Sequence, residues 1–267
     1  MSLGPGDPCL LTPLAREALL RARAVVGYSG YIGLIEPGLL AGRTVFSTGM
    51  TGEVERCRKA VEFARAGLPT AVVCGGDAGI YAMAGLVLEV LEAENLIDRV
   101  PFEVVPGVPA LAAAAALLGA PLMHDFACVS LSDLLTPWEV IEKRLTAAAC
   151  ADFVIVLYNP RSRNRPEHLA RALELIGRHR GPDTPVGAVS RAYRPGQSVS
   201  LARLSQFDPQ GVDMQTVLVV GNSATRPCGR FLLTPRGYER KYGLAGASAG
   251  RGGPEQGRKA RVPAERA

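Results

Sequence analysis

The stretch Phe153–Pro160 reads FVIVLYNP, six apolar residues followed by an Asn-Pro pair. A short apolar run that contains β-branched residues and ends in a turn signal is typical of a strand buried within a sheet. Thr70–Cys74 (TAVVC) has the same character and ends in Gly75-Gly76-Asp77. We therefore expect both segments to be strands, with Phe153–Tyr158 in a central position of its sheet.

Amphipathic stretches alternate with short apolar runs on both sides of these two segments. The spacing of apolar residues predicts helices over Glu53–Ala66, Ala82–Glu94, Pro109–Leu118, Trp138–Ala149 and Pro166–Arg178. Further strands are predicted over Ala24–Val26, Thr44–Phe46, Phe102–Val105, Cys128–Leu131, Val186–Val189, Val199–Leu204 and Gln215–Val220. Such alternation indicates an α/β protein with helices flanking mixed sheets.

The alternation is interrupted between Gly119 and Phe126, where Gly119, Pro121 and Asp125 fall close together. We expect a boundary there between two α/β domains, residues 1–120 and 121–243, which are of ordinary domain size. In folds of this kind ligands bind at the carboxyl ends of strands and between domains. A ligand site is therefore expected at the strand ends or between the two domains.

The net charge of +5 is concentrated near the C-terminus. Residues 244–267 contain five basic and two acidic side chains, which leaves about +2 for the other residues. This segment is rich in Gly, Ala and Pro and shows no hydrophobic periodicity, so we expect a disordered basic tail. A charge of about +2 on the body argues against a nucleic-acid partner.

Neither a membrane span nor a metal site is expected. The longest apolar run, Ala110–Leu118, has nine residues, whereas a bilayer crossing needs about 20. The six cysteines are scattered without a C-x-x-C pair, which argues against a zinc site or a disulfide framework. Reduced cysteines that pack as small hydrophobic residues fit a cytoplasmic protein.

Two glycine-rich turns are candidate ligand sites. Gly4–Pro8 (GPGDP) would let backbone amides approach a ligand, but it is equally an ordinary turn. It is not a dinucleotide fingerprint, because that motif would require glycine at Cys9, and it lacks the Gly-Lys-Ser/Thr of a phosphate loop. Gly75–Asp77 follows a buried strand and allows close backbone approach, while Gly-Asp is also a common turn.

Arginines follow two of the predicted strands. Their guanidinium groups suit carboxylates or phosphates, although solvated loops are equally consistent with them. These residues are Arg161, Arg163, Arg165, Arg191 and Arg194. Neither H-E-x-x-H nor G-x-S-x-G occurs, so zinc hydrolysis and a Ser-His-Asp esterase are poorly supported. His124-Asp125 is either a proton-transfer pair or a structural pair at the domain boundary.

Taken in order along the chain, five motifs resemble the tetrapyrrole methylase family. They are GPGDP (4–8), GGD (75–77), VPG (105–107), LYNP (157–160) and VLVVGNSAT (217–225). The resemblance runs from Gly4 to about Tyr242. It implies a two-domain α/β fold, S-adenosyl-L-methionine as cofactor, a small-molecule tetrapyrrole substrate, a site between the domains and a homodimer.

Longer stretches resemble the members of this family that methylate C-17 during cobalamin biosynthesis. They are residues 27–37, 46–60, 76–89, 124–145, 157–165 and 234–242. The resemblance implies methylation of C-17 of precorrin-3B with ring contraction to precorrin-4. A cobalt-containing substrate, another ring carbon and, in a different class, an RNA-binding methylase stay open as alternatives.

The resemblance also assigns site residues. The cofactor residues that it implies are Pro5, Gly75, Gly76, Asp77, Ile80, Pro109, Ala110, Tyr158, Asn159, Ala192, Gln215 and Thr216. The five arginines named above are the expected partners of the substrate carboxylates. The candidates for proton transfer or for donors during ring contraction are Asp7, Ser29, Tyr31 and His124.

The sequence departs from the family pattern at three places. Only Met1–Leu3 precede GPGDP where relatives have a full strand, so we expect a sheet position that is incompletely filled. Pro109-Ala110 stands where relatives use a Thr-Ala pair. Uroporphyrinogen methylases carry an acidic catalytic residue where this chain has Tyr28–Tyr31 (YSGY), so no acid or base is transferred to that position.

Overall fold

The computed structural model describes residues 1–243, and the predicted basic tail, 244–267, lies outside the described residues. The chain divides into two compact units, Met1–Thr234 and Pro235–Ala267. The described part of the second unit contains helix α9 (Tyr238–Tyr242), in which the two terminal tyrosine rings stack with their centroids 6.0 Å apart. Every candidate site residue belongs to the first unit.

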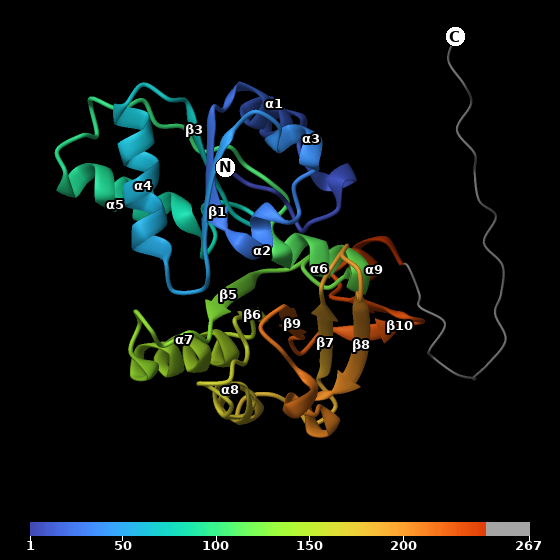
Figure 1. Ribbon diagram of the computed structural model, residues 1–267. Coiled ribbons are helices and arrows are strands. Elements are labelled where there is room, and N and C mark those ends of the chain that lie inside the picture. The colour runs from blue at the N-terminus through green and yellow to red at the C-terminus, as the bar shows by residue number, and fades with distance from the viewer. Residues whose placement is uncertain (244–267) are drawn as a thin grey trace, which may run out of the picture. The chain divides into compact units, whose positions relative to one another are not determined.

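The N-terminal sheet of the first unit is parallel. It contains β1 (Ala24–Tyr28), β2 (Thr44–Thr48) and β3 (Thr70–Val73) in the order β2-β1-β3. The helices of this half are α1 (Pro13–Arg21), α2 (Ser29–Ile32), α3 (Pro37–Leu40), α4 (Glu53–Arg65) and α5 (Met83–Ala93), and a short 3-10 helix, η1, spans Pro8–Leu10. Figure 1 shows α4 and α5 on one side of β1 and α1 and α3 on the other.

Alternating side chains explain how this sheet is covered on both faces. Val25, Ala71 and Val73 pack in one apolar cluster with Leu19 of α1 and Leu39 of α3. Val72 points the other way and packs on a second cluster, formed by α4, α5 and Leu96. Successive side chains of a strand face opposite sides of a sheet, so a sheet with helices on both faces needs apolar residues at consecutive positions.

The C-terminal sheet is mixed. It contains β5 (Phe126–Ser130), β6 (Val154–Tyr158), β9 (Thr216–Val220), β7 (Pro185–Ser190) and β8 (Ser198–Arg203), in the order β5-β6-β9-β7-β8. Strands β5 and β6 are parallel, and the other neighbours are antiparallel. The prediction of an α/β fold with mixed sheets is confirmed.

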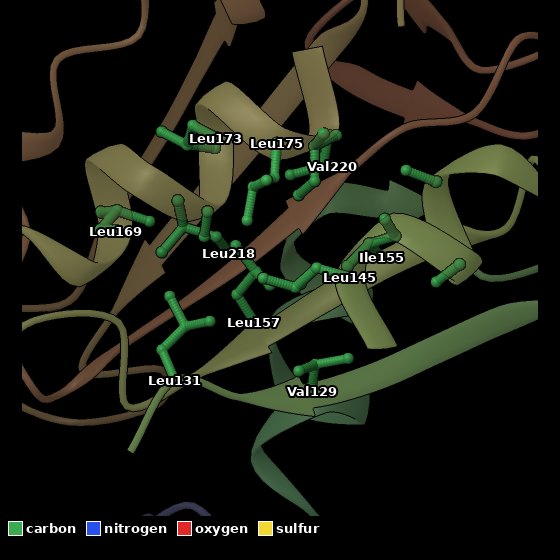
Figure 2. Packing of buried hydrophobic residues seen from close by; sticks show 14 of the residues in the cluster. Val129, Leu131, Leu145, Ile155, Leu157, Leu169, Leu173, Leu175, Leu218 and Val220 are labelled. Carbon is green, nitrogen blue, oxygen red and sulfur yellow. The ribbon is translucent and has the colours of Figure 1, made fainter. Parts of the chain in front are cut away.

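Strand β6 is buried on both faces, as its continuous apolar run predicted. Ile155 and Leu157 pack in the cluster under α7 (Trp138–Cys150) and α8 (His168–Gly177), part of which is drawn in Figure 2. Val154 and Val156 pack on the opposite face with α6 (Ala110–Leu118). The core of this half therefore consists of two apolar layers separated by one sheet.

A third, small sheet lies beside the chain segment where we expected the domain boundary. It contains β10 (Arg226–Cys228), β11 (Phe231–Leu233) and β4 (Gly119–Ala120), in the order β10-β11-β4. Two further 3-10 turns, η2 (Leu204–Gln206) and η3 (Pro209–Gly211), follow β8. The three strands of the parallel sheet precede residue 119 and the five of the mixed sheet follow residue 125, but the division into domains at 120 and 121 stays a prediction.

The predicted strand over Phe102–Val105 is wrong, because this segment has irregular structure. The Val105 carbonyl accepts hydrogen bonds from the backbone N–H and the hydroxyl of Ser2, and Ser2 forms an isolated bridge with Cys74 of the turn after β3. Met1–Leu3 thus pair only beside the end of β3. Two hydrogen bonds from one residue, Ser2, to one carbonyl do not make a ladder, so Phe102–Val105 is not a strand.

Among residues 1–243, no helix combines the length and the apolar character that a bilayer crossing demands.

Candidate active site

The three parallel strands of the N-terminal sheet end in turns at the same edge, where ligands bind in open α/β sheets. β1 ends at Tyr28 and is followed by Ser29–Tyr31 at the start of α2, and β3 is followed by the double-glycine turn. A Cβ atom on Gly75 would lie 2.7 Å from Cε1 of Tyr31, so only glycine allows the Tyr31 ring to lie there. The Tyr31 ring also meets Tyr28 edge-on, with the ring centroids 5.3 Å apart.

The two glycine-rich motifs form one structure. The Gly76 N–H donates to the Gly4 carbonyl at 2.7 Å, and the Gly4 N–H donates to the Gly76 carbonyl at 3.1 Å. Both glycines have positive φ, +67° for Gly4 and +70° for Gly76, which a residue with a side chain adopts at a cost. Pro5, which follows Gly4, is buried.

Asp77 ties this structure to a third turn. One carboxylate oxygen accepts the Gly79 N–H at 2.8 Å, and the other accepts the Gly107 N–H of the VPG turn at 3.0 Å. A Cβ on Gly107 would lie 2.4 Å from the Cβ of Ser2, so this approach also requires glycine. Both oxygens of Asp77 therefore already hold loops together, and half-buried Ile80 continues the same turn.

The N-terminus of α6 is held by Tyr158, the last residue of β6 in the mixed sheet. The Leu111 N–H donates to the Tyr158 hydroxyl at 2.7 Å. Ala110, Tyr158 and Ala192 are partly buried and pack against the same apolar cluster. A Cβ on Gly76 would lie 3.5 Å from the Ala110 nitrogen, so the glycine turn and the start of α6 are adjacent. Burial raises the pKa of the Tyr158 hydroxyl, which keeps it protonated near neutral pH.

Asn159 connects the ends of β5 and β6. Its side-chain amide donates to the Ser130 hydroxyl at 2.9 Å, and its φ of +51° turns the chain sharply after β6. Asparagine tolerates this left-handed region better than most residues. The Tyr158-Asn159 pair thus occupies the strand end where the resemblance placed it.

The turn after β7 is hydrogen-bonded to Gln215, the residue before β9. Arg191, with φ +49°, donates from its backbone N–H to the Gln215 carbonyl at 3.0 Å and from Nε to the Gln215 side chain at 2.8 Å. The hydroxyl of Thr216, which is 5% exposed, donates to Asp213 at 2.9 Å. The side chains of Gln215 and Thr216 are thus engaged within the protein.

Arg194 links this turn to the first glycine loop. Its Nε donates to the Pro5 carbonyl, and a Cβ on Gly6 would lie 2.6 Å from the same Nε atom. Burial lowers the pKa of Arg194, and the neighbouring Tyr31 acts in the opposite direction. Burial raises the pKa of Tyr31, and Arg194 partly opposes that shift.

The arginines after β6 have different surroundings. Arg161 donates to the Gln210 carbonyl at 2.7 Å, whereas Arg163 is exposed. Arg165 is only 8% exposed and donates to the Leu131 carbonyl at 2.9 Å, with Asp133 at 3.9 Å. Its guanidinium group therefore has a structural role, and we no longer expect Arg165 to bind substrate.

The four candidates for proton transfer lie in unlike positions. Asp7 accepts the Cys9 N–H at 2.8 Å and caps η1. Ser29 and His124 are exposed, and the Nδ1 atom of His124 accepts the Asp125 N–H at 2.9 Å. Tyr31 differs from the other three, because it contacts the double-glycine turn and interacts with Arg194.

Sequence reasoning did not single out Tyr81. This residue follows the double-glycine turn, and its hydroxyl donates to the Cys128 carbonyl of β5 at 2.8 Å. No spacing rule signals the contact, because the partner lies 47 positions away and accepts through its backbone. Within the described residues, no group of three or more His, Cys, Asp or Glu side chains could hold a metal ion.

Glycine turns, a helix N-terminus and strand ends from two sheets meet in this α/β protein, and they form the candidate ligand site at the strand ends. Comparison with known proteins identifies the family. The model of the Tetrapyrrole (Corrin/Porphyrin) Methylases matches residues 1–208, and the chain belongs to this family. The resemblance seen in the sequence is thereby confirmed, and the relatives and solved structures described next are named methyltransferases.

Two curated relatives are similar over most of this chain. A "Probable cobalt-factor III C(17)-methyltransferase" of Salmonella typhimurium is 49% identical over 89% of this chain and 98% of its own length. A "Cobalt-factor III methyltransferase" of Priestia megaterium is 47% identical over 91% of this chain, which spans only 45% of that relative.

Two solved structures share the fold. The crystal structure of the methyltransferase CobJ has a TM-score of 0.84 and 40% identity, over 88% of this chain and 97% of that one. A uroporphyrin-III C-methyl transferase from Thermus thermophilus, complexed with S-adenyl homocysteine, has a TM-score of 0.60 and 28% identity. The match covers 83% of this chain and 95% of that one.

Proposed function

We propose that this protein is an S-adenosyl-L-methionine-dependent methyltransferase that acts on C-17 of a tetrapyrrole in cobalamin biosynthesis. The observation that carries the proposal is the meeting of three segments, in which the Gly76 turn lies against Ala110 and the Tyr158 hydroxyl holds the first turn of α6. The names of the Salmonella and Priestia relatives support a cobalt-factor III substrate. Metal-free precorrin-3B is the second candidate.

The residues around this meeting point fit the cofactor. Gly76, Ala110 and Ala192 have no side chain beyond a Cβ, so they leave room for a folded nucleoside, and the partly buried Tyr158 ring offers it an apolar face. When bound, S-adenosyl-L-methionine supplies an electrophilic methyl group. The side chains of Asp77, Gln215 and Thr216 are already engaged, so backbone groups of the turns that the internal hydrogen bonds leave free would hold the cofactor.

The substrate carries several carboxylates, and Arg194 is the best placed of the arginines to bind one. It lies between the Pro5 loop and Tyr31, and only its Nε is used by the Pro5 carbonyl. A guanidinium group binds carboxylates through parallel N–H donors. Arg191 and exposed Arg163 are further candidates.

The transfer itself depends on alignment. Transfer of the methyl group to C-17 would be an in-line displacement in which the sulfur–methyl electron pair stays with sulfur, so no protein nucleophile would be required and the protein would act by aligning the reactants. For the ring contraction that precorrin-3B would undergo, Tyr31 is suited as a donor and not as a base. Burial raises the pKa of its hydroxyl, so it stays protonated near neutral pH and can stabilise a developing negative charge.

The test is an incubation of the purified protein with methyl-labelled cofactor and, in separate samples, cobalt-factor III or precorrin-3B. We expect one added methyl group, placed at C-17 by NMR, with the cobalt substrate turned over faster. Methylation of another carbon would disprove the assignment to C-17. Failure to bind S-adenosylhomocysteine in a calorimetric titration would disprove the cofactor assignment.

A homodimer and a cytoplasmic location are part of the same proposal. The dimer rests on the family resemblance, and the location rests on the cysteines, which are scattered and read as reduced thiols. Light scattering of the purified protein tests the dimer, and cell fractionation tests the location.

A further inference from the structure

Tyr81 connects the double-glycine turn with the mixed sheet. It lies four residues after Asp77, and its hydroxyl donates to the Cys128 carbonyl at 2.8 Å. Cys128 belongs to β5, the edge strand of the five-stranded sheet. The hydrogen bond therefore joins a loop of the parallel sheet to a strand of the other sheet.

The backbone at Tyr81 is in a sparsely populated conformation. Its φ is +50°, which is uncommon for an aromatic residue. Such a conformation persists where the surroundings over-determine it, and it is frequent at functional sites. The residue as a whole is 54% exposed, so burial of its ring does not account for the strain.

The ring of Tyr81 contacts Tyr158. The two ring centroids are 5.4 Å apart and the planes are inclined by 53°, a separation at which aromatic pairs attract each other. Tyr158 in turn accepts the Leu111 N–H, which belongs to the first turn of α6. A single chain of contacts thus runs from the glycine turn through Tyr81 and Tyr158 to the start of α6.

The Tyr81 hydroxyl remains a donor over the working range of pH. Burial raises its pKa, so the O–H that bonds the Cys128 carbonyl stays protonated at neutral pH and well above it. The hydroxyl can therefore donate to the Cys128 carbonyl throughout the neutral pH range.

We propose that Tyr81 is a positioning residue that sets the separation between the Gly75–Asp77 turn and the α6 N-terminus, and so the shape of the cofactor site. It acts through Tyr158, and the inference rests on the proposed function. Tyr81 is not required to touch the reacting atoms.

The experiment compares Tyr81→Phe, which keeps the ring and loses the hydroxyl, with Tyr81→Leu, which loses both. Tyr242→Phe in α9 is the matched control, because it removes an exposed tyrosine hydroxyl outside the first unit. Binding of S-adenosylhomocysteine is measured by titration calorimetry and the Tm of the ligand-free protein by scanning calorimetry. The KM for S-adenosyl-L-methionine and kcat are measured as well.

The loss of one hydrogen bond predicts S-adenosylhomocysteine binding about threefold to tenfold weaker in Tyr81→Phe, and weaker still in Tyr81→Leu. The KM for the cofactor rises in parallel, while kcat changes by less than about twofold. Tyr242→Phe binds as the wild type does.

The double variant Tyr81→Leu/Tyr158→Phe tests whether Tyr81 acts through Tyr158. If it does, the losses of S-adenosylhomocysteine affinity in the two single variants are coupled. The double variant then binds more tightly than the product of the two single losses predicts. Strictly additive losses would overturn the route through Tyr158.

A lower Tm with unchanged S-adenosylhomocysteine affinity in both Tyr81 variants would make the residue merely structural and overturn the proposal. Absence of binding by the wild type itself would overturn the proposed function and this inference together. Binding by the wild type with full affinity in Tyr81→Leu would overturn the inference alone.

Discussion

Two turns at the same end of the mixed sheet contain similar residues with different contacts. One follows β6 and contains Arg165, and the other follows β7 and contains Arg194. Each begins with a residue of positive φ, +51° at Asn159 and +49° at Arg191. Arg165 turns inward onto the Leu131 carbonyl, while Arg194 reaches the Pro5 carbonyl of the glycine loop. The neighbours of a guanidinium group, and not its place after a strand, decide whether it supports the fold, as Arg165 does, or could bind a ligand, the role proposed for Arg194.

The largest effect that would test this contrast is on stability. We expect Arg165→Ala to lower the free energy of unfolding by about 3 kcal/mol, because it leaves buried carbonyl groups without a donor. Urea denaturation measures the change, and Arg163→Ala, which removes an exposed side chain from the same turn, is the control. A loss below about 0.5 kcal/mol in Arg165→Ala would remove the distinction between the two turns.

The next effect concerns substrate binding. We expect Arg194→Ala to raise the KM for the tetrapyrrole by about tenfold, which corresponds to about 1.4 kcal/mol. Arg194→Lys keeps the charge and loses the planar fork, so it should recover only part of the affinity. Steady-state kinetics with varied tetrapyrrole gives both values. An unchanged KM in Arg194→Ala would mean that this arginine, like Arg165, serves the fold.

A smaller effect is expected at Arg191. Its side chain holds Gln215 and Asp213 but is partly exposed. Such contacts contribute about 1 kcal/mol or less. Arg191→Ala should therefore lower stability by about that amount and weaken S-adenosylhomocysteine binding about twofold to fivefold. Thermal unfolding and titration calorimetry provide the measurements, and a stability loss as large as that of Arg165→Ala would contradict the ranking.

The smallest effect on stability near neutral pH is expected from Tyr31 and Tyr158, the tyrosines that adjoin the two turns. Burial raises the pKa of Tyr31 and of Tyr158, so the folded state holds these protons more tightly than the unfolded state. The resulting stability is complete below about pH 10 and is lost as pH rises through the folded-state values. Tyr31→Phe should therefore flatten the decline of Tm above about pH 10 and leave Tm at pH 7 to 9 nearly independent of pH. An unaltered alkaline decline in Tyr31→Phe would show that its proton is not linked to folding.

The sequence predicted those elements whose signal is local. The β6 run and the helices α4 and α7 were located within a few residues, because a strand buried on both faces and an amphipathic helix each leave a periodic pattern. The prediction of a strand over Phe102–Val105 is wrong, because a strand also needs a ladder of hydrogen bonds and Val105 bonds with a single residue, Ser2. Helix α1 was missed although Thr12 caps it and Pro13 begins it.

The candidate site was predictable only as a set of separate segments. Glycine motifs and strand ends were visible, but the mutual bonding of Gly4 and Gly76 depends on tertiary structure. The same holds for Arg165 and Arg194, whose different partners are backbone carbonyls that no residue type reveals. Tyr81 could not be found for the same reason.

The bonds between Gly4 and Gly76, and between Asp77 and the Gly107 N–H, also bear on the order of assembly. They join positions 72 residues apart (Gly4 and Gly76) and 30 residues apart (Asp77 and Gly107), so the corner where these three turns meet depends on contacts between distant parts of the sequence. Contacts of high sequence separation form slowly, because the intervening loop must close first. A ligand that recognises this corner therefore selects fully folded molecules and protects them from unfolding in proportion to its concentration.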